Sequence, residues 1–266
     1  MNLTVKTFIS LTFCFSMCCA YSQFDNTLAE LGLKNAVKSV LETDYQIGGN
    51  ESKAERNVLT KFSENGCKTE ERHFVPSGEI SYSANFKYSS SGELMEETVN
   101  NTGKDFVRTY SSNAQKITIH IRYETAAQLS AEYYLDDKGK VTQRVDYDDE
   151  GKTFRTFKYS YSSNRLQLET QTMQESILQF KYAYNSKGRL EKKMEMSPAG
   201  KTLHTVSYTY DANGNVLTET SSYSNDPDKL VIQYKYIYDN RGNWTEKRES
   251  MNGNLFSITK REITYY

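Results

Sequence analysis

The chain has 266 residues and a net charge of −1, because 33 Lys and Arg nearly balance 34 Asp and Glu. This balance excludes a basic surface field for nucleic acid and an acidic tail, so nucleic acid is not an expected partner. Tyr is abundant, at 21 residues, and Pro is rare, at 3, which is typical of strands rather than helices. The mean hydropathy of −0.74 favours a thin sheet with two wetted faces over a compact sandwich.

The N-terminal segment, residues 1–22, is predicted to be a secretory signal peptide. Lys6 is its only charged residue, and an apolar run of the usual length covers residues 8–20. Ala20-Tyr21-Ser22 places small residues before a cleavage site that would leave Gln23 as the new N-terminus. We therefore expect an exported protein, in the periplasm, at the cell surface or outside the cell. After cleavage we expect no transmembrane segment.

Three of the four cysteines, Cys14, Cys18 and Cys19, lie in this segment, so a lipidated signal and an uncleaved anchor are the alternatives. Cleavage would leave Cys67 as the single cysteine of the mature chain. An intramolecular disulfide is then impossible, and we expect the fold to be stabilised by its backbone hydrogen bonds.

From about residue 60 to the end, one short pattern recurs. Each copy has a turn glycine, an aromatic or aliphatic residue four positions before it, in most copies another aromatic two positions earlier, and in most an apolar residue two positions after it. The turn glycines are Gly66, Gly92, Gly139, Gly188, Gly214 and Gly242. The repeat is about 26 residues long, and a second turn lies about halfway through it, which predicts two strands per repeat. Degenerate copies near Ala114 and Arg165 fill the gaps.

We therefore predict one all-β domain over residues 23–266. It would be an elongated, twisted antiparallel β-meander of about eight two-strand repeats, because short turns impose antiparallel neighbours. Residues 256–266 are expected to form an edge strand at the end of the sheet. Lys260 and Arg261 would discourage other chains from pairing with that edge.

Two stretches carry a family resemblance. Tyr208-Thr-Tyr-Asp-Ala-Asn-Gly-Asn-Val and Tyr236-Ile-Tyr-Asp-Asn-Arg-Gly-Asn-Trp resemble the YD repeat of RHS-type proteins. Together with the signal segment, the chain looks like the small secreted YD-repeat-like proteins of Bacteroidetes-type bacteria, over roughly residues 33–266. The large relatives curl their sheet into a hollow shell around a toxin. This chain is too short for such a shell, and Asp226-Pro227 is not followed by the processing motif. The resemblance implies YD-like β-repeats, with no assigned chemistry.

No catalytic, metal or cofactor site is predicted. His73, His120 and His204 share no metal-ligand spacing. The turns at residues 211–214 and 239–242 lack the later ligands of a calcium loop. No phosphate-binding loop, nucleophile elbow or paired-His motif is present, and the scattered carboxylates give no sign of a catalytic cleft.

The Tyr residues of the repeat are the main candidates for a binding site. Period-two alternation places them on one face of the sheet. The residues between them, such as Lys181, Thr209 and Ile237, lie on the other face. They either pack across strands as core or form an exposed platform for sugar rings or an extended peptide. The candidate ligand-binding residues are Tyr182, Tyr184, Tyr208, Tyr210, Tyr236, Tyr238 and Trp244.

The leading hypothesis is a secreted or envelope-facing, non-enzymatic repeat protein that acts as an interaction or binding scaffold for a glycan or a protein. Export combined with repeats and no catalytic motif supports it. The first alternative is a carbohydrate hydrolase of the cell envelope. The second is a fragment or partner of an RHS-type toxin system.

Overall fold

The computed structural model describes residues 27–28, 31–48, 51–124 and 126–266, so the predicted signal peptide at 1–22 lies outside the described residues. The strands of this part form one antiparallel sheet in which neighbours in sequence pair. The strands are β1 Val37–Gly48, β2 Glu51–Phe62, β3 Lys68–Phe74, β4 Ile80–Tyr88, β5 Leu94–Asn101, β6 Phe106–Ser112, β7 Lys116–Arg122, β8 Ala127–Leu135, β9 Val141–Tyr147, β10 Thr153–Ser162, β11 Arg165–Met173, β12 Ser176–Tyr184, β13 Leu190–Met196, β14 Thr202–Tyr210, β15 Val216–Tyr223, β16 Lys229–Tyr238, β17 Trp244–Met251 and β18 Asn254–Tyr265.

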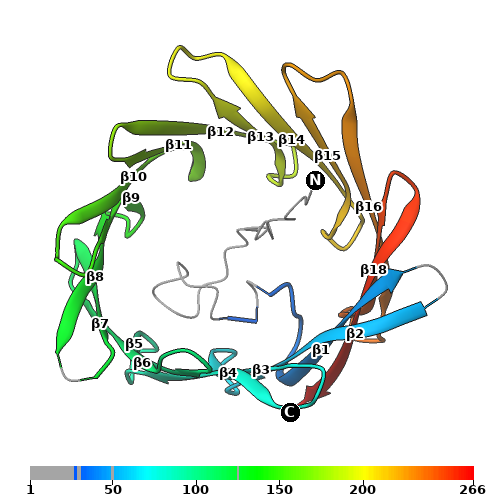
Figure 1. The fold of residues 1–266 in the computed structure, drawn as a ribbon, viewed down its shortest axis with the longest axis horizontal. Coiled ribbons are helices and arrows are strands. Elements are labelled where there is room, and N and C mark those ends of the chain that lie inside the picture. Colours follow the sequence, from blue (N-terminus) through cyan, green and yellow to red (C-terminus); the bar gives the residue numbers. More distant parts are fainter. Residues whose placement is uncertain (1–26, 29–30, 49–50, 125) are drawn as a thin grey trace.

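The sheet closes into a barrel, because β1 pairs with β18 as well as with β2. Figure 1 shows the resulting ring of strands. The predicted elongated meander of about eight two-strand repeats is therefore wrong: the described chain is a closed antiparallel barrel of 18 strands. The expected edge strand at 256–266 is also wrong, since β18 pairs on both sides and the Arg261 Nε–H donates to Glu42 Oε1 at 2.6 Å.

Regular β-bulges explain why the sheet curls. In repeat after repeat the register shifts at the residue four positions before the turn glycine, as at Tyr184, Tyr210 and Tyr238. A bulge bends its strand and increases the local twist. Because the bulges recur on the same side of the sheet, their bends add up until the two ends meet.

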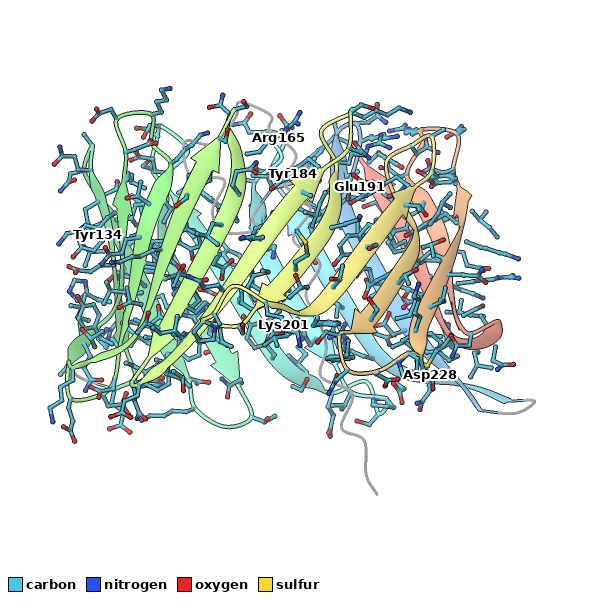
Figure 2. The ribbon with its side chains drawn as sticks, turned by 90° about the horizontal axis from the view of Figure 1, so that it is seen from above. Tyr134, Arg165, Tyr184, Glu191, Lys201 and Asp228 are labelled. Atoms are coloured by element: carbon cyan, nitrogen blue, oxygen red, sulfur yellow. The ribbon has the colours of Figure 1, made fainter. Side chains whose placement is uncertain are left out.

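The turns lie at the two ends of the barrel. We call the end with Gly188, Gly214 and Gly242 the first rim, and the end with Gly200 and Gly253 the second rim. Figure 2 places Arg165 and Tyr184 toward the first rim and Lys201 and Asp228 toward the second. The predicted turn chemistry is confirmed at Gly214, which has φ of +98°, while Asp211 Oδ1 accepts the N–H of Asn215 at 2.8 Å.

The Tyr-bearing face lines the interior. Residues 31–36, just before β1, lie inside the ring in Figure 1, and Leu33 among them packs against Val40. The β1–β18 register puts Val40 on the same face as Arg261, whose guanidinium lies 3.4 Å from the Trp244 ring centroid. Trp244 in turn lies 6.1 Å from the ring of Tyr236. The Tyr-bearing face is therefore the inner face.

The wall is one layer thick and wet on both sides. Tyr223 and Leu178 on the inner face are 54% and 43% exposed, and Ile237 on the outer face is 52% exposed. Eighteen strands about 4.8 Å apart, tilted by about 40°, give a backbone radius of about 18 Å, wide enough for water inside. This single-layer wall accounts for the low mean hydropathy.

Residues 31–36 fasten the seam between the first and last strands. The Lys34 N–H donates to Asn243 Oδ1 at 2.6 Å, and Asn243 Nδ2 donates to the Lys34 carbonyl at 2.9 Å and to the Tyr265 hydroxyl at 2.8 Å. Asn243 is only 1% exposed. Leu33 adds the apolar contact with Val37 and Phe62. The segment before β1 thus joins the last hairpin to the first.

Closure can be tested with a cross-link at the seam. Ser39 and Thr264 face each other across β1 and β18, with their hydroxyl oxygens 2.6 Å apart. In a Cys67→Ser background, Ser39→Cys with Thr264→Cys should form a disulfide on oxidation and raise the free energy of unfolding by about 2–4 kcal/mol. Mass spectrometry and denaturation would show both effects. Ser39→Cys with Thr109→Cys, on the outer face of β6, is the control that should not cross-link, and an uncross-linked 39/264 pair in folded protein would contradict closure.

Candidate functional site

Tyr residues at the first rim fasten each repeat to the one before it. The hydroxyls of Tyr184 and Tyr210 donate to the carbonyls of Leu166 and Leu190, at 2.9 and 2.6 Å. These carbonyls belong to the residues opposite the preceding bulges, Tyr161 and Tyr184. Each ring also lies beneath a cation from the preceding turn, as Tyr210 does beneath Arg189 at 5.6 Å. We call this contact the rim staple.

The last repeats use a variant of the rim staple. The Tyr238 hydroxyl donates to Asp211 and accepts from Asn215 Nδ2 at 2.7 Å. Burial, followed by the hydrogen bond to Asp211, raises the pKa of Tyr238 to about 12. The Tyr236 hydroxyl donates to the Val216 carbonyl at 3.0 Å. These hydroxyls therefore hold repeats together.

A second set of inner residues forms a belt of aromatic–charge pairs nearer the middle of the wall. In each pair the aromatic residue six positions before the turn glycine lies directly opposite the charged residue five positions after it. The degenerate repeat near Arg165, which has no turn glycine, supplies an equivalent pair. The pairs are Phe86–Glu97, Tyr133–Arg144, Tyr159–Glu169, Tyr182–Lys193, Tyr208–Glu219 and Tyr236–Lys247. From Arg144 to Lys247 the sign of the charge alternates from one pair to the next.

Most belt charges have partners within the wall. Glu97 accepts from Arg108 Nη1 at 2.8 Å and from the Tyr110 hydroxyl at 3.0 Å. The ion pair of Arg144 with Asp146 has its closest atoms 2.6 Å apart. These charge-assisted hydrogen bonds satisfy the carboxylate of Glu97 and the guanidinium of Arg144.

The belt charges Glu169 and Lys247 also have partners within the wall. Glu169 Oε2 accepts from the Tyr182 hydroxyl at 2.7 Å, and Lys247 pairs with Glu249 at 2.7 Å. These belt positions are therefore explained by the fold alone.

Several inner side chains on β13–β16 differ, among them two aromatic and two charged residues. Within the described part of the chain, Lys193, Tyr208, Glu219 and Tyr234 make no hydrogen bond or ion pair through their side chains. The Lys193 ammonium instead lies 4.5 Å from the ring centroid of Phe180. All four are half-buried, so part of each side chain is accessible to a solute in the lumen. We call these four residues the open belt.

The electrostatics of the open belt centre on Glu219. Burial and then the charge of Glu249 raise the pKa of Glu219 above its ordinary value. Burial and then the charge of Glu219 raise the pKa of both Tyr208 and Tyr234. The carboxylate and the two rings are therefore close neighbours in an environment that lacks a matching cation.

The seven predicted ligand-binding residues share the inner face but occupy three settings. Tyr184, Tyr210 and Tyr238 are rim staples, whereas Tyr182, Tyr208 and Tyr236 belong to the belt. Trp244 is buried beneath Arg261, as a core residue would be. Their role in ligand binding stays a prediction.

Lys193, Glu219 and Tyr234 are not among the residues predicted from the sequence. The fixed position of a charge five residues after each turn glycine could have identified Lys193 and Glu219.

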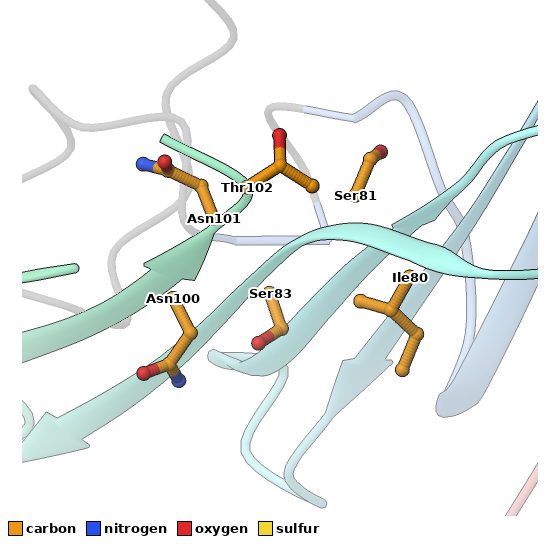
Figure 3. A pocket seen from close by; sticks show the side chains of 6 residues that line it. All are labelled: Ile80, Ser81, Ser83, Asn100, Asn101 and Thr102. Atoms are coloured by element: carbon orange, nitrogen blue, oxygen red, sulfur yellow. The ribbon is translucent and has the colours of Figure 1, made fainter. Parts of the chain in front are cut away.

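A shallow hollow of about 190 Å³ lies elsewhere, at the second rim between β4 and β5. Figure 3 shows its lining, which is Ile80, Ser81, Ser83, Asn100, Asn101 and Thr102. It contains neither a charged group nor an aromatic ring, and none of the predicted ligand-binding residues borders it.

No group of three or more His, Cys, Asp or Glu side chains in the described residues is arranged to hold a metal ion. The described residues also contain no helix that is long and apolar enough to cross a membrane.

Comparison with known proteins gives distant structural likenesses. No protein-family model and no curated protein matches the chain. A porin-like protein from Bacteroides uniformis has a TM-score of 0.47 and 15% identity, covering 86% of this chain and 98% of that chain. A porin-like protein from Bacteroides vulgatus has a TM-score of 0.45 and 11% identity, covering 88% and 99%. The structure of TcdB2–TccC3 without its hypervariable C-terminal region has a TM-score of 0.29 and 12% identity, covering 80% of this chain and 15% of that chain. Likenesses this distant support no functional conclusion, and the YD-repeat resemblance stays a prediction.

The rim staple predicts a specific stability effect. Tyr210→Phe removes the hydroxyl that satisfies the Leu190 carbonyl, and should lower the free energy of unfolding by about 0.5–1.5 kcal/mol in urea denaturation. Tyr223→Phe is the matched control, because Tyr223 is 54% exposed and its hydroxyl makes no hydrogen bond within the described chain. Equal stability of the two variants would show that the staple contributes nothing.

Proposed function

We propose that this protein is an exported, non-enzymatic scaffold that binds a carbohydrate chain on its inner face, at the open belt. One observation carries the proposal: Tyr208 and Glu219 face each other in the belt, yet neither polar group is satisfied by the described chain. At four other belt charges the fold itself supplies the partners, namely at Glu97, Arg144, Glu169 and Lys247. Half-buried polar groups without protein partners are satisfied by water or by a ligand.

The chemistry of the open belt suits a sugar. Tyr208 and Tyr234 present ring faces on which the C–H faces of a sugar can pack, and their free hydroxyls can bond sugar hydroxyls. Lys193 adds a donor and Glu219 adds an acceptor. Binding sites of this kind combine aromatic walls with a few placed polar groups.

Export is inferred from residues 1–22, which have the pattern of a signal peptide. A binding scaffold outside the cytoplasm requires no nucleotide or cofactor. The closed barrel is suited to that setting because closure removes both sheet edges.

One observation favours a second candidate function, a carbohydrate hydrolase. Burial and Glu249 raise the pKa of Glu219, as a general acid requires, while Glu249 is paired with Lys247. A glycosidase uses two carboxylates in such contrasting environments. Appearance of new reducing ends on incubation with oligosaccharides, abolished by Glu219→Gln, would establish the hydrolase and overturn the scaffold.

The binding proposal predicts that Tyr208→Ala weakens carbohydrate binding without unfolding the barrel. Tyr208 is half-buried and makes no side-chain hydrogen bond within the described chain, so its loss should lower the melting temperature moderately and leave the barrel folded. Replacing an aromatic contact should weaken binding on the order of tenfold in a glycan-array or calorimetric titration. Tyr45→Ala, on the outer face of β1, is the control and should bind normally. Normal binding by Tyr208→Ala would place any ligand elsewhere.

A further inference from the structure

We propose that Glu219, walled by Tyr208 and Tyr234, binds the protonated amine of an amino sugar. The inference rests on the proposed carbohydrate-binding function and names the sugar class that the open belt selects.

The strand register brings these groups together. Glu219 lies directly opposite Tyr208 on β14 and opposite Ile232 on β16. Tyr234 follows Ile232 by two residues, so its ring lies on the same inner face, and its opposite neighbour on β17 is Glu249. One carboxylate therefore lies between two aromatic residues, with a second carboxylate beyond them.

No cation in the described part of the chain neutralises Glu219. Lys247, the next cation of the belt, is engaged by Glu249 at 2.7 Å. Lys193, the preceding one, rests over the ring of Phe180 at 4.5 Å. Among the described residues the site thus keeps an excess negative charge beside π faces. The raised pKa of Glu219, caused by burial and then by Glu249, agrees with this geometry.

An ammonium group satisfies both features of this site. It forms a charge-assisted hydrogen bond with the carboxylate and a cation–π contact with the Tyr rings. A uronic acid would be repelled by Glu219 and Glu249, and an N-acetylated sugar would leave Glu219 without a counter-charge. A metal ion needs more oxygen ligands than two carboxylates and phenol rings provide.

The test compares three probes by isothermal titration calorimetry on the folded protein at pH 7. They are the glucosamine tetramer, the N-acetylglucosamine tetramer and tetralysine. We expect the glucosamine tetramer to bind on the order of tenfold more tightly than its acetylated counterpart. Glu219→Gln, which keeps the shape and removes the charge, should abolish this preference and retain the weaker binding of the acetylated tetramer.

Glu195→Gln is the matched control, since Glu195 lies on the inner face of β13 opposite His204. It should keep the preference for the amine. Equal affinity for both tetramers in the unmodified protein would overturn the amine site while leaving carbohydrate binding intact. Binding of tetralysine alone would overturn the sugar assignment, and binding of neither tetramer would refute the proposed function as well. A preference that survives Glu219→Gln would also overturn the inference, and melting curves of both variants would confirm that they are folded.

Discussion

The barrel depends on the Tyr side chain that crosses from one repeat to the next at the first rim. At each bulge the strand bends, and the bulge disturbs the regular backbone ladder. The hydroxyls of Tyr184 and Tyr210 satisfy carbonyls opposite the bulges of the preceding repeats, so bending and bonding occur together. Asn243 performs the equivalent task at the seam, where it joins Lys34 to Tyr265. The rim staple therefore supports the curl that the bulges produce, and the Asn243 contacts hold the seam where the barrel closes.

The single-layer wall of the described residues leaves charged side chains on the inner face in contact with water. In a packed core each buried charge needs a partner, because an unpaired charge is costly to desolvate. In a wide, wet barrel the inner charges keep access to water, so the wall tolerates Glu219 without a partner and Lys193 on an aromatic ring. Whether an inner-face charge has an ion-pair partner therefore differs from one belt position to the next.

The local pattern predicts much of this structure. Gly and Asp mark the turns, as at Gly214, and period two places the Tyr residues on one face. Closure could not be predicted in the same way. Spacing defines which strands are neighbours, but the curl comes from bulges whose bends add up across all strands. The contact between Glu42 and Arg261 joins residues at opposite ends of the chain, and no repeat contains it. Glu219 escaped notice because its equivalents change sign from repeat to repeat.

The state of Glu219 follows from the residue two positions after it. In three other repeats that inner neighbour contacts the belt charge. Asp146 pairs with Arg144, and Glu249 pairs with Lys247. The amide of Gln171 donates to Glu169 at 2.6 Å. The equivalent neighbour of Glu219 is Ser221, whose hydroxyl lies 2.6 Å from His204 Nε2 and is already engaged. A short side chain in place of an amide or a counter-ion thus leaves one carboxylate of the belt unmatched. The equivalent charges of other repeats form pairs that stabilise the wall. Here the Glu219 carboxylate faces the lumen without a partner among the described residues.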